Sequence, residues 1–148
     1  MSKYHQGKFT PLRPEKYIGD VKNIVYRSGW ELSVMQWLDK NPSILKWGSE
    51  ELIIAYIHPL DNMPHRYYPD FIALAKQRDG TVKKIIIEIK PDAQTKPPVK
   101  PKRMTKRYLK EVETYAININ KWKAATDFAK KNNFEFKILT EHHIDGIK

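Results

Sequence analysis

The chain contains no cysteine and no long apolar run. Without cysteine it can form neither disulfide bonds nor thiolate metal sites, which suits a reducing cytoplasm. No stretch approaches the roughly 18 apolar residues that mark a membrane-spanning helix, and the N-terminal MSKYHQGKFTPLRPEKY has no apolar centre like that of a secretory signal. A glycine loop of the kind that cradles phosphates is also absent, so we expect no membrane partner and no use of nucleoside triphosphates.

Acidic residues are few relative to basic ones. The chain has 17 Asp and Glu against 27 Lys and Arg, a net charge of +10. A soluble protein with solvated lysine faces would have this composition, but so would a protein that binds a polyanion, and the excess favours nucleic acid. A length of 148 residues with 41% hydrophobic side chains fits one domain over residues 1–148. Residues 1–25 are expected to form a basic N-terminal arm.

Hydrophobic periodicity predicts an α/β fold in the order helix, three strands, helices, strand. Ser28 and Glu31 form a capping-box pattern at the start of the first helix, which Asn41-Pro42 ends near Lys40. The further expected elements are strands over 51–59, 66–76 and 82–90, helical stretches between about 105 and 132, and a last strand over 134–140. The four tryptophans lie on apolar periods and are interpreted as core residues: Trp30, Trp37, Trp47 and Trp122.

The turn between the second and third expected strands determines which residues pair. Arg78-Asp79-Gly80 is typical of a three-residue loop with glycine at the left-handed position. In that register Gln77 pairs with Thr81, and counting back places Asp70 opposite Glu88. A two-residue loop would instead place Asp70 opposite Ile89, on the other face of the strand. The turn chemistry favours the first register and a positive φ at Gly80.

The strand KKIIIEIKP carries Glu88 and Lys90 on one face, away from Ile85, Ile87 and Ile89. Two carboxylates side by side repel each other, and a divalent cation relieves that repulsion. Oxygen ligands suit Mg²⁺, with Mn²⁺ able to replace it, and such an ion activates water at a phosphate. The alternative is an ion pair of Glu88 with Lys90 at an exposed strand end. The register and the positive charge favour the metal site.

Asp70 preceded by Pro69, and followed later by Glu88-Ile89-Lys90, resembles the signature of the PD-(D/E)XK nucleases. The resemblance implies a restriction-endonuclease-like core, in which a mixed β-sheet is flanked by helices. It also implies a DNA endonuclease in which Asp70, Glu88 and the backbone carbonyl of Ile89 bind the metal, while Lys90 assists the water. A glutamate on the first helix often completes such a site, and Glu31 is the matching residue; its alternative role is the capping box.

Longer stretches resemble a family of T-even-phage nucleases that act in head completion: YRSGWELSVMQWLDKNPSILKWGSE, RYYPDF, IEIKPDAQTKPPVKP and INKWKAA. The first half is also similar to the endonuclease subunit of cut-and-paste transposons. This resemblance implies processing of genome ends, phage head or portal-vertex proteins as partners, and residence in the host cytoplasm and then the virion head. Two alternatives remain open: a Holliday-junction-type resolvase on the same fold, and a non-catalytic DNA-binding capsid completion protein.

No acidic residue stands between Asp92 and Glu111, and this basic stretch directly follows Lys90. Its basic residues, together with Arg27, are the expected phosphate contacts: Lys96, Lys100, Lys102, Arg103, Lys106, Arg107 and Lys110. A mobile solvated loop is the alternative. The five histidines are interpreted as surface or core residues: His5, His58, His65, His142 and His143.

Overall fold

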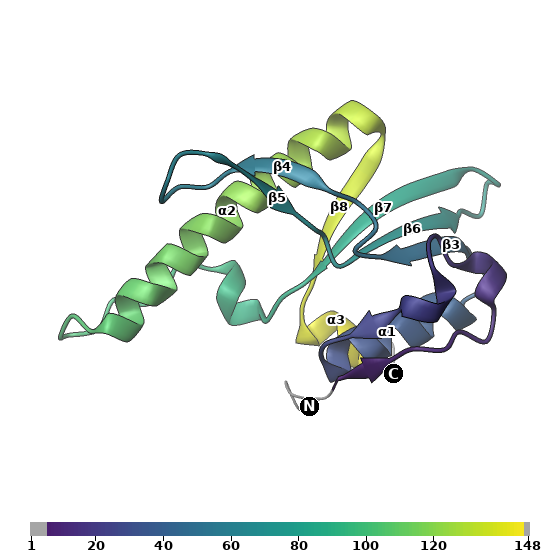
Figure 1. Cartoon of the computed structure of the whole chain (residues 1–148), viewed down its shortest axis with the longest axis horizontal. Coiled ribbons are helices and arrows are strands. Elements are labelled where there is room, and N and C mark those ends of the chain that lie inside the picture. Colours follow the sequence, from purple (N-terminus) through teal and green to yellow (C-terminus); the bar gives the residue numbers. More distant parts are fainter. Residues whose placement is uncertain (1–5, 147–148) are drawn as a thin grey trace.

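A four-stranded mixed sheet organises the chain in the computed structural model, which describes residues 6–146. The strand order is β3–β6–β7–β8, with β8 parallel to β7 and the other neighbours antiparallel (Figure 1). The expected fold class, a mixed sheet flanked by helices, is confirmed. The strands are β3 (Ile44–Ser49), β6 (Phe71–Lys76), β7 (Val82–Ile89) and β8 (Phe134–Leu139), and the helices are α1 (Gly29–Lys40), α2 (Lys106–Asn132) and α3 (Glu141–Asp145).

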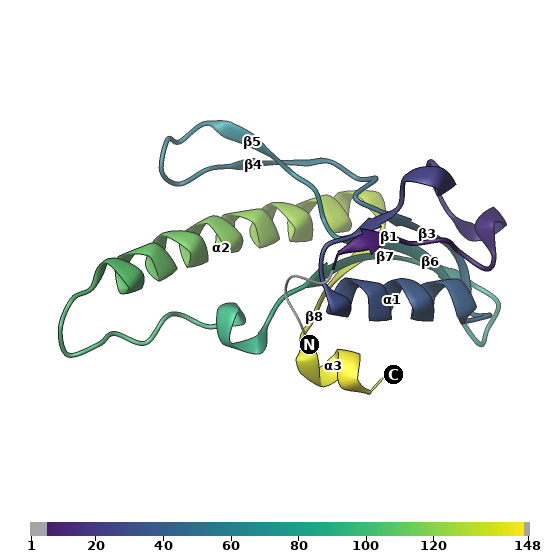
Figure 2. The same ribbon diagram turned by 60° about the horizontal axis from the view of Figure 1, so that its bottom comes forward.

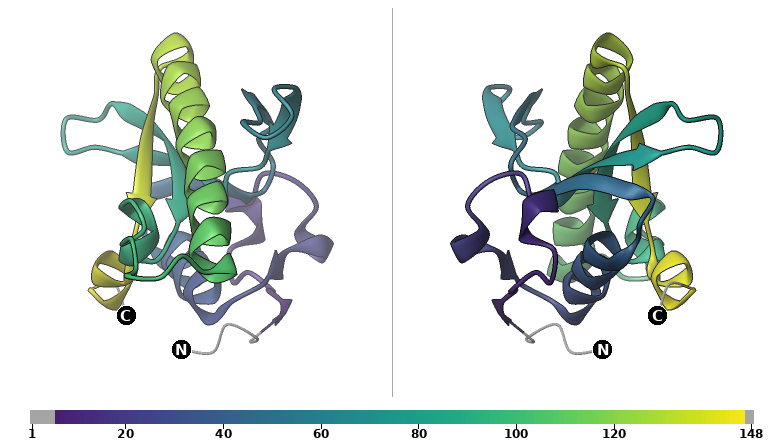
Figure 3. Two further views of the ribbon diagram at one scale, coloured as in Figure 1. Left: turned by 90° about the vertical axis from the view of Figure 1, so that its left-hand side faces the viewer. Right: turned by 90° about the vertical axis from the view of Figure 1, so that its right-hand side faces the viewer.

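The central strand β7 is apolar on both faces because a separate core covers each face. Ile87 packs with α1, α3 and the N-terminal residues, whereas Ile86 packs with α2 and a two-stranded hairpin. Figure 3 shows α1 and α3 at one end of the molecule, and α2 running beside β8 with the hairpin next to it. The isoleucine run is therefore explained by burial on two sides, as in strands of α/β sheets generally.

The hairpin was not expected from the sequence, and it corrects two predicted strands. The prediction 51–59 contains β4 (Ile54–Ile57), which pairs with β5 (Pro64–Tyr67) outside the main sheet (Figure 2). The prediction 66–76 is wrong as one strand, because the chain leaves the hairpin and enters the sheet at Tyr68–Asp70. The first strand of the sheet is β3, whose bulge after Ile44 hides the alternation that identifies strands.

The two helical stretches expected between residues 105 and 132 are one continuous helix, α2. Thr105 caps its first turn by accepting a hydrogen bond from the Tyr108 amide at 3.1 Å, and Asn133 ends it with a φ of 59°. Trp122, on α2, and Trp47, on β3, are both buried and pack in the two cores, in agreement with their interpretation as core residues. Among the described residues 6–146, no helix is both long and apolar enough to cross a membrane.

The turn between β6 and β7 has the predicted register. Gln77 donates to the Thr81 carbonyl at 2.8 Å, Gly80 donates to the Gln77 carbonyl at 3.0 Å, and Gly80 has a φ of 88°. Ile72 pairs with Ile86, as expected. The two-residue loop is thereby excluded, and the sheet presents Asp70 and Glu88 at the same end.

Residues 6–25 pack on the body of the molecule instead of extending from it. A short ladder pairs β1 (Gly7–Lys8) with β2 (Val25–Tyr26), and two single 3₁₀ turns lie between them, at Pro14–Lys16 and Val21–Asn23. Lys16 is buried, and its Nζ donates to carbonyl oxygens at the end of α1, at 2.8 Å to Leu38, 2.8 Å to Asp39 and 2.9 Å to Asn41. This segment supplies a cation to the negative end of a helix dipole.

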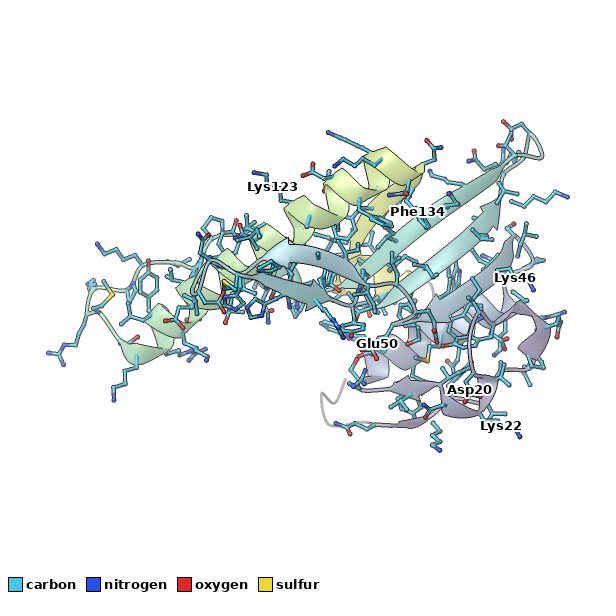
Figure 4. All side chains as sticks on the ribbon, turned by 45° about the horizontal axis from the view of Figure 1, so that its top comes forward. Asp20, Lys22, Lys46, Glu50, Lys123 and Phe134 are labelled. Atoms are coloured by element: carbon cyan, nitrogen blue, oxygen red, sulfur yellow. The ribbon has the colours of Figure 1, made fainter. Side chains whose placement is uncertain are left out.

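We expect Lys16→Met to destabilise the protein by about 2 kcal/mol, because it leaves these carbonyl groups without their donor while keeping the apolar stem. The free energy of unfolding in urea measures the effect. Lys22→Met is the matched control, because Lys22 is exposed on the outer edge of the same segment (Figure 4). Equal stability of the two variants would show that the Lys16 ammonium contributes nothing.

Candidate active site

A cleft of about 550 Å³ lies where β7 ends, beside the start of α1, the middle of α2 and the base of the β4–β5 hairpin. All four residues predicted for catalysis line it: Glu31, Asp70, Glu88 and Lys90. The other lining residues are Ser28, Trp30, Arg66, Tyr67, Tyr68, Ile89, Pro91, Gln94 and Lys121. Elements that are distant in the sequence therefore bring the four predicted residues together in one cleft.

Asp70 stands one residue before β6, and its side chain is fixed by β7. The ladder between the two strands ends at the pair Phe71–Ile87, so the next position along it is Asp70 opposite Glu88. Instead of continuing the ladder, Asp70 Oδ2 accepts a hydrogen bond from the Ile89 amide at 2.7 Å. This contact orients the carboxylate toward the end of β7 and leaves its other oxygen available to the cleft.

Glu88 is buried, with 5% of its surface exposed. The indole Nε1 of Trp122 approaches its Oε2 at 3.4 Å. The Tyr67 hydroxyl is buried nearby and has no hydrogen-bond partner among residues 6–146. Burial raises the pKa of Tyr67, and the charges of Glu88 and Asp70 raise it further, which keeps the phenol protonated as a donor. A buried donor without a partner suits a site that receives water or a ligand.

Burial also raises the pKa of Asp70 well above its usual value, and the negative charge of Glu88 adds to the increase, while the Ile89 amide opposes it. Two carboxylates this close are stable together when a proton or a cation compensates their charge. A perturbed carboxylate in a cleft is typical of functional sites.

The position of Glu31 is compatible with both roles that the sequence left open. Ser28 Oγ accepts the Glu31 amide at 3.1 Å and thereby caps α1. The Glu31 carboxylate itself makes only long contacts, at 3.5 Å from both the Arg27 amide and the Ser28 hydroxyl, and it faces the cleft. Burial raises the pKa of Glu31, against the opposing Arg27 amide and charge. The cap therefore uses the backbone of Glu31, and the carboxylate remains free for the cleft.

The donors in the cleft fit a hard divalent cation. They are carboxylate oxygens of Asp70, Glu88 and Glu31, with the backbone carbonyl of Ile89 next to them in sequence. Within residues 6–146, each oxygen of these carboxylates accepts at most one hydrogen bond, so lone pairs remain for a cation. An all-oxygen donor set without cysteine or histidine is the preference of Mg²⁺ and Mn²⁺.

Three cations line the cleft, and two of them were missed from the sequence. Lys90 was predicted, whereas Arg66 comes from the hairpin and Lys121 from the middle of α2. Burial lowers the pKa of Lys121; the charges of Glu88 and Asp70 oppose this, and Lys90 adds to it. Its ammonium also lies 5.6 Å from the centre of the Tyr67 ring. No spacing rule links Lys121 to Asp70, so only the packing of α2 on the sheet reveals it.

The predicted phosphate contacts fall into two groups. Seven lie on an exposed loop and on the first turn and a half of α2, extending from the cleft: Lys96, Lys100, Lys102, Arg103, Lys106, Arg107 and Lys110. Lys96 is paired with Asp92 at 3.1 Å, and Arg107 lies 3.9 Å from Glu111. Arg27 is paired with Glu50 at 2.6 Å and does not line the cleft, although the next residue, Ser28, does.

The raised pKa of Asp70 makes the metal-free protein less stable as the pH rises. Above the usual aspartate value of 3.8 the folded state retains a proton that the unfolded chain releases. Stability is then greatest at acid pH and is lost until the pH passes the raised pKa. We expect the free energy of unfolding in EDTA to fall from pH about 4 upward in the wild type, relative to Asp70→Asn. Parallel curves for the two proteins would contradict the raised pKa.

Comparison with known proteins gives two matches. Residues 41–141 match the family model described as the TnsA-like endonuclease N-terminal domain. Over 148 aligned residues the chain is 42% identical to the head completion nuclease of Enterobacteria phage T4, covering 97% of this chain and 94% of the phage protein. The first match contains Asp70, Glu88 and Lys90 but not Glu31.

Proposed function

Because the chain belongs to the TnsA-like endonuclease family, we propose that it is a metal-dependent DNA endonuclease whose active site is the acidic cleft. The observation that carries the proposal is the convergence of Asp70 and Glu88 at the end of β7, beside Lys90. The family supports the reaction class, and this geometry supports the choice of residues. A basic loop leaves the same end of β7, which suits a polyanionic substrate.

In this proposal Asp70, Glu88 and the Ile89 carbonyl hold Mg²⁺, and Glu31 completes the ligand set. When bound, the ion supplies Lewis-acid assistance at the scissile phosphate. The Ile89 amide keeps Asp70 in its orientation, and Trp122 fixes Glu88, so both carboxylates are positioned before substrate arrives. Mn²⁺ is expected to replace Mg²⁺, because it accepts the same oxygen donors.

The cations of the cleft bind and orient the phosphate in this proposal. Lys90 contributes a positive charge next to the carboxylates and holds the attacking water or a phosphate oxygen. Arg66 can bind a phosphate with two parallel hydrogen bonds, which fixes its orientation. Burial lowers the pKa of Lys121, which shows that its ammonium group is partly shielded from water. There the ammonium interacts strongly with the negative charge that develops on the phosphate.

The relative from phage T4 is named for head completion. We therefore place the proposed activity at the ends of a phage genome during head completion, with phage head or portal-vertex proteins as partners. The protein would act in the host cytoplasm during assembly and remain with the virion head. Incubation of purified protein with isolated heads, followed by sedimentation, tests this part separately from catalysis; a protein that never co-sediments contradicts it.

Cleavage assays with several DNA forms test the enzymatic proposal. Purified protein is incubated with supercoiled plasmid, linear duplex and branched DNA, in Mg²⁺ and in EDTA. The proposal predicts cleavage of duplex DNA in Mg²⁺ and none in EDTA. Cleavage of branched DNA alone would instead favour a junction resolvase, and binding without cleavage in either buffer would contradict the proposal in favour of a non-catalytic capsid protein.

We expect Lys121→Met to lower the cleavage rate by about 10- to 100-fold while changing DNA affinity little, because one half-buried charge beside the carboxylates is lost. Rates at saturating DNA and the dissociation constant separate these effects. Lys123→Met is the matched control, because it removes an exposed lysine from the same helix (Figure 4). Equal rates for the two variants would remove Lys121 from the site.

A further inference from the structure

The tip of the β4–β5 hairpin gathers two imidazoles and a carboxylate outside the acidic cleft. One ligand atom from each of His58, Asp61 and His65 lies within 4.8 Å of the others. His65 Nε2 is 2.7 Å from Asp61 Oδ2, and the two imidazole ring centres are 4.5 Å apart. None of these residues lines the acidic cleft, so the cluster is a separate feature.

The strand register explains why the two histidines meet. In the β4–β5 ladder Tyr56 pairs with His65, and Ile57 pairs with Pro64. Because alternate residues share a face, His58 lies on the same face as Tyr56 and therefore beside His65. Asp61 comes from the loop between the strands. The hairpin thus closes the seven-residue separation of the histidines. Asp61 lies three residues after His58 and four before His65, so it stands between them in the turn.

The hairpin tip is held in place by its own hydrogen bonds. The His58 amide donates to the Met63 carbonyl at 2.9 Å, and the Asn62 amide donates to the His58 carbonyl at 2.8 Å. Asn62 has a φ of 57°, the left-handed conformation that asparagine tolerates in tight turns. Asp61 Oδ1 accepts the Met63 amide at 3.0 Å, which leaves Oδ2 directed at His65. The three donor groups therefore project from an ordered turn.

We propose that His58, Asp61 and His65 bind a divalent transition-metal ion of the zinc class. Two imidazoles and one carboxylate suit Zn²⁺ and chemically similar ions, whereas Mg²⁺ prefers oxygen donors alone. With metal–ligand bonds of about 2.0–2.1 Å, tetrahedral donors stand about 3.4 Å apart. Small rotations of three surface side chains bring the present cluster to that spacing, and water supplies the remaining ligand.

Binding of the ion to His58 would break one existing hydrogen bond. The Leu60 amide donates to His58 Nδ1 at 3.2 Å. Coordination through Nδ1 uses the same lone pair, and coordination through Nε2 requires a proton on Nδ1, so either mode ends this hydrogen bond. Leu60 is exposed, so its amide turns to water at little cost. Loss of this hydrogen bond at the Leu60 amide is therefore an observable sign that the ion has bound.

A surface ion pair between Asp61 and His65 is the simpler interpretation of part of this cluster. It accounts for the 2.7 Å contact, but it leaves the close, tilted approach of the His58 and His65 rings without a role. A metal ion uses all three side chains and ties the loop to both strands. Since Arg66 and Tyr67 follow His65 and line the cleft, the bound ion would also steady the side of the cleft that the hairpin provides.

Zinc titration calorimetry tests the proposal, with hydrogen exchange to locate the ion. We expect the wild type to bind one Zn²⁺ that His58→Ala and His65→Ala each weaken by about 10- to 100-fold or more. Zinc should slow amide exchange in residues 57–66, apart from the released Leu60 amide. His142→Ala is the matched control, because it removes an exposed imidazole from another element and should leave the affinity unchanged.

The proposal is independent of DNA cleavage, because Asp70→Asn should disable the acidic cleft and leave zinc binding at the hairpin intact. Circular dichroism before and after each titration checks that the histidine variants are folded. Equal zinc affinity in the wild type and both histidine variants would overturn the proposal. So would zinc-dependent protection confined to the ends of β6 and β7, since the ion would then occupy the acidic cleft alone.

Discussion

Asp70→Asn and Glu88→Gln are each expected to lower Mg²⁺-dependent cleavage by on the order of 10³-fold or more while DNA binding persists. Each substitution keeps the shape of the side chain and removes one negative charge from the proposed ligand set. Asp70→Asn also retains an oxygen that can accept the Ile89 amide, which Asp70 now binds at 2.7 Å. The loss should therefore reflect chemistry and not a rearranged strand end.

The same variants should behave oppositely in stability measurements. Burial and, after it, the negative charge of Glu88 raise the pKa of Asp70. In EDTA each variant should melt at the wild-type temperature or above it, because the substitution removes the repulsion between the two carboxylates. In millimolar Mg²⁺ the wild type should gain stability and the variants should not, because ligand binding stabilises only a folded state that binds the ion. Thermal melts with and without Mg²⁺ measure both effects.

Asp127→Asn is the matched control for these variants. Asp127 is an exposed carboxylate on α2, away from the acidic cleft, so its loss changes the net charge equally without touching the proposed ligands. It should cleave DNA at the wild-type rate and keep the gain of stability in Mg²⁺. If Asp70→Asn cleaves as fast as Asp127→Asn, the cleft does not contain the active site.

Replacement of Lys96, Lys100, Lys102 and Arg103 by glutamine is expected to weaken DNA binding for all sequences alike. These residues are exposed along the loop that leaves the cleft, and Pro97, Pro98 and Pro101 favour an extended chain. Each phosphate contact contributes about 0.9 to the slope of log affinity against log salt. Because Lys96 is already paired with Asp92, the slope should flatten by about 3 and not by the full value for four contacts.

The salt dependence separates phosphate contacts from a general loss of charge. A control variant carries glutamine at four exposed lysines outside the loop: Lys22, Lys40, Lys76 and Lys130. It should retain most of the wild-type slope, and both variants should fold with near wild-type stability, since exposed charges contribute little. Equal slopes in the wild type and the loop variant would mean that the loop does not contact DNA.

The proximity of Asp70 and Glu88 could be predicted from the sequence, because the turn between β6 and β7 sets the register of the two strands. Gly80 adopts the positive φ that a three-residue loop requires, and this register brings Asp70 next to Glu88. The PD-(D/E)XK resemblance then supplied a role for Glu31, and the structure places its carboxylate at the same cleft. These predictions depend on local turn chemistry and on a short motif, both of which are encoded in neighbouring residues.

The remaining features depend on contacts between distant elements. Lys121 reaches the cleft only because α2 packs against β8 and β4, and Arg66 reaches it only because residues 54–67 form a hairpin beside the sheet. Apolar and polar residues do not alternate regularly along β3 because of its bulge, so hydrophobic periodicity could not predict this strand. The basic N-terminal segment looks solvated in the sequence, yet Lys16 is buried against the end of α1.

The most direct test is a crystal of the protein soaked in Mn²⁺, with anomalous diffraction recorded to locate the ion. We expect an anomalous peak about 2.2 Å from carboxylate oxygens of both Asp70 and Glu88 and from the Ile89 carbonyl oxygen. Mn²⁺ is suitable because it replaces Mg²⁺ at oxygen ligands and scatters anomalously. A crystal with Mn²⁺ bound elsewhere, at the hairpin histidines for example, and none between Asp70 and Glu88 would contradict the proposed metal-dependent active site.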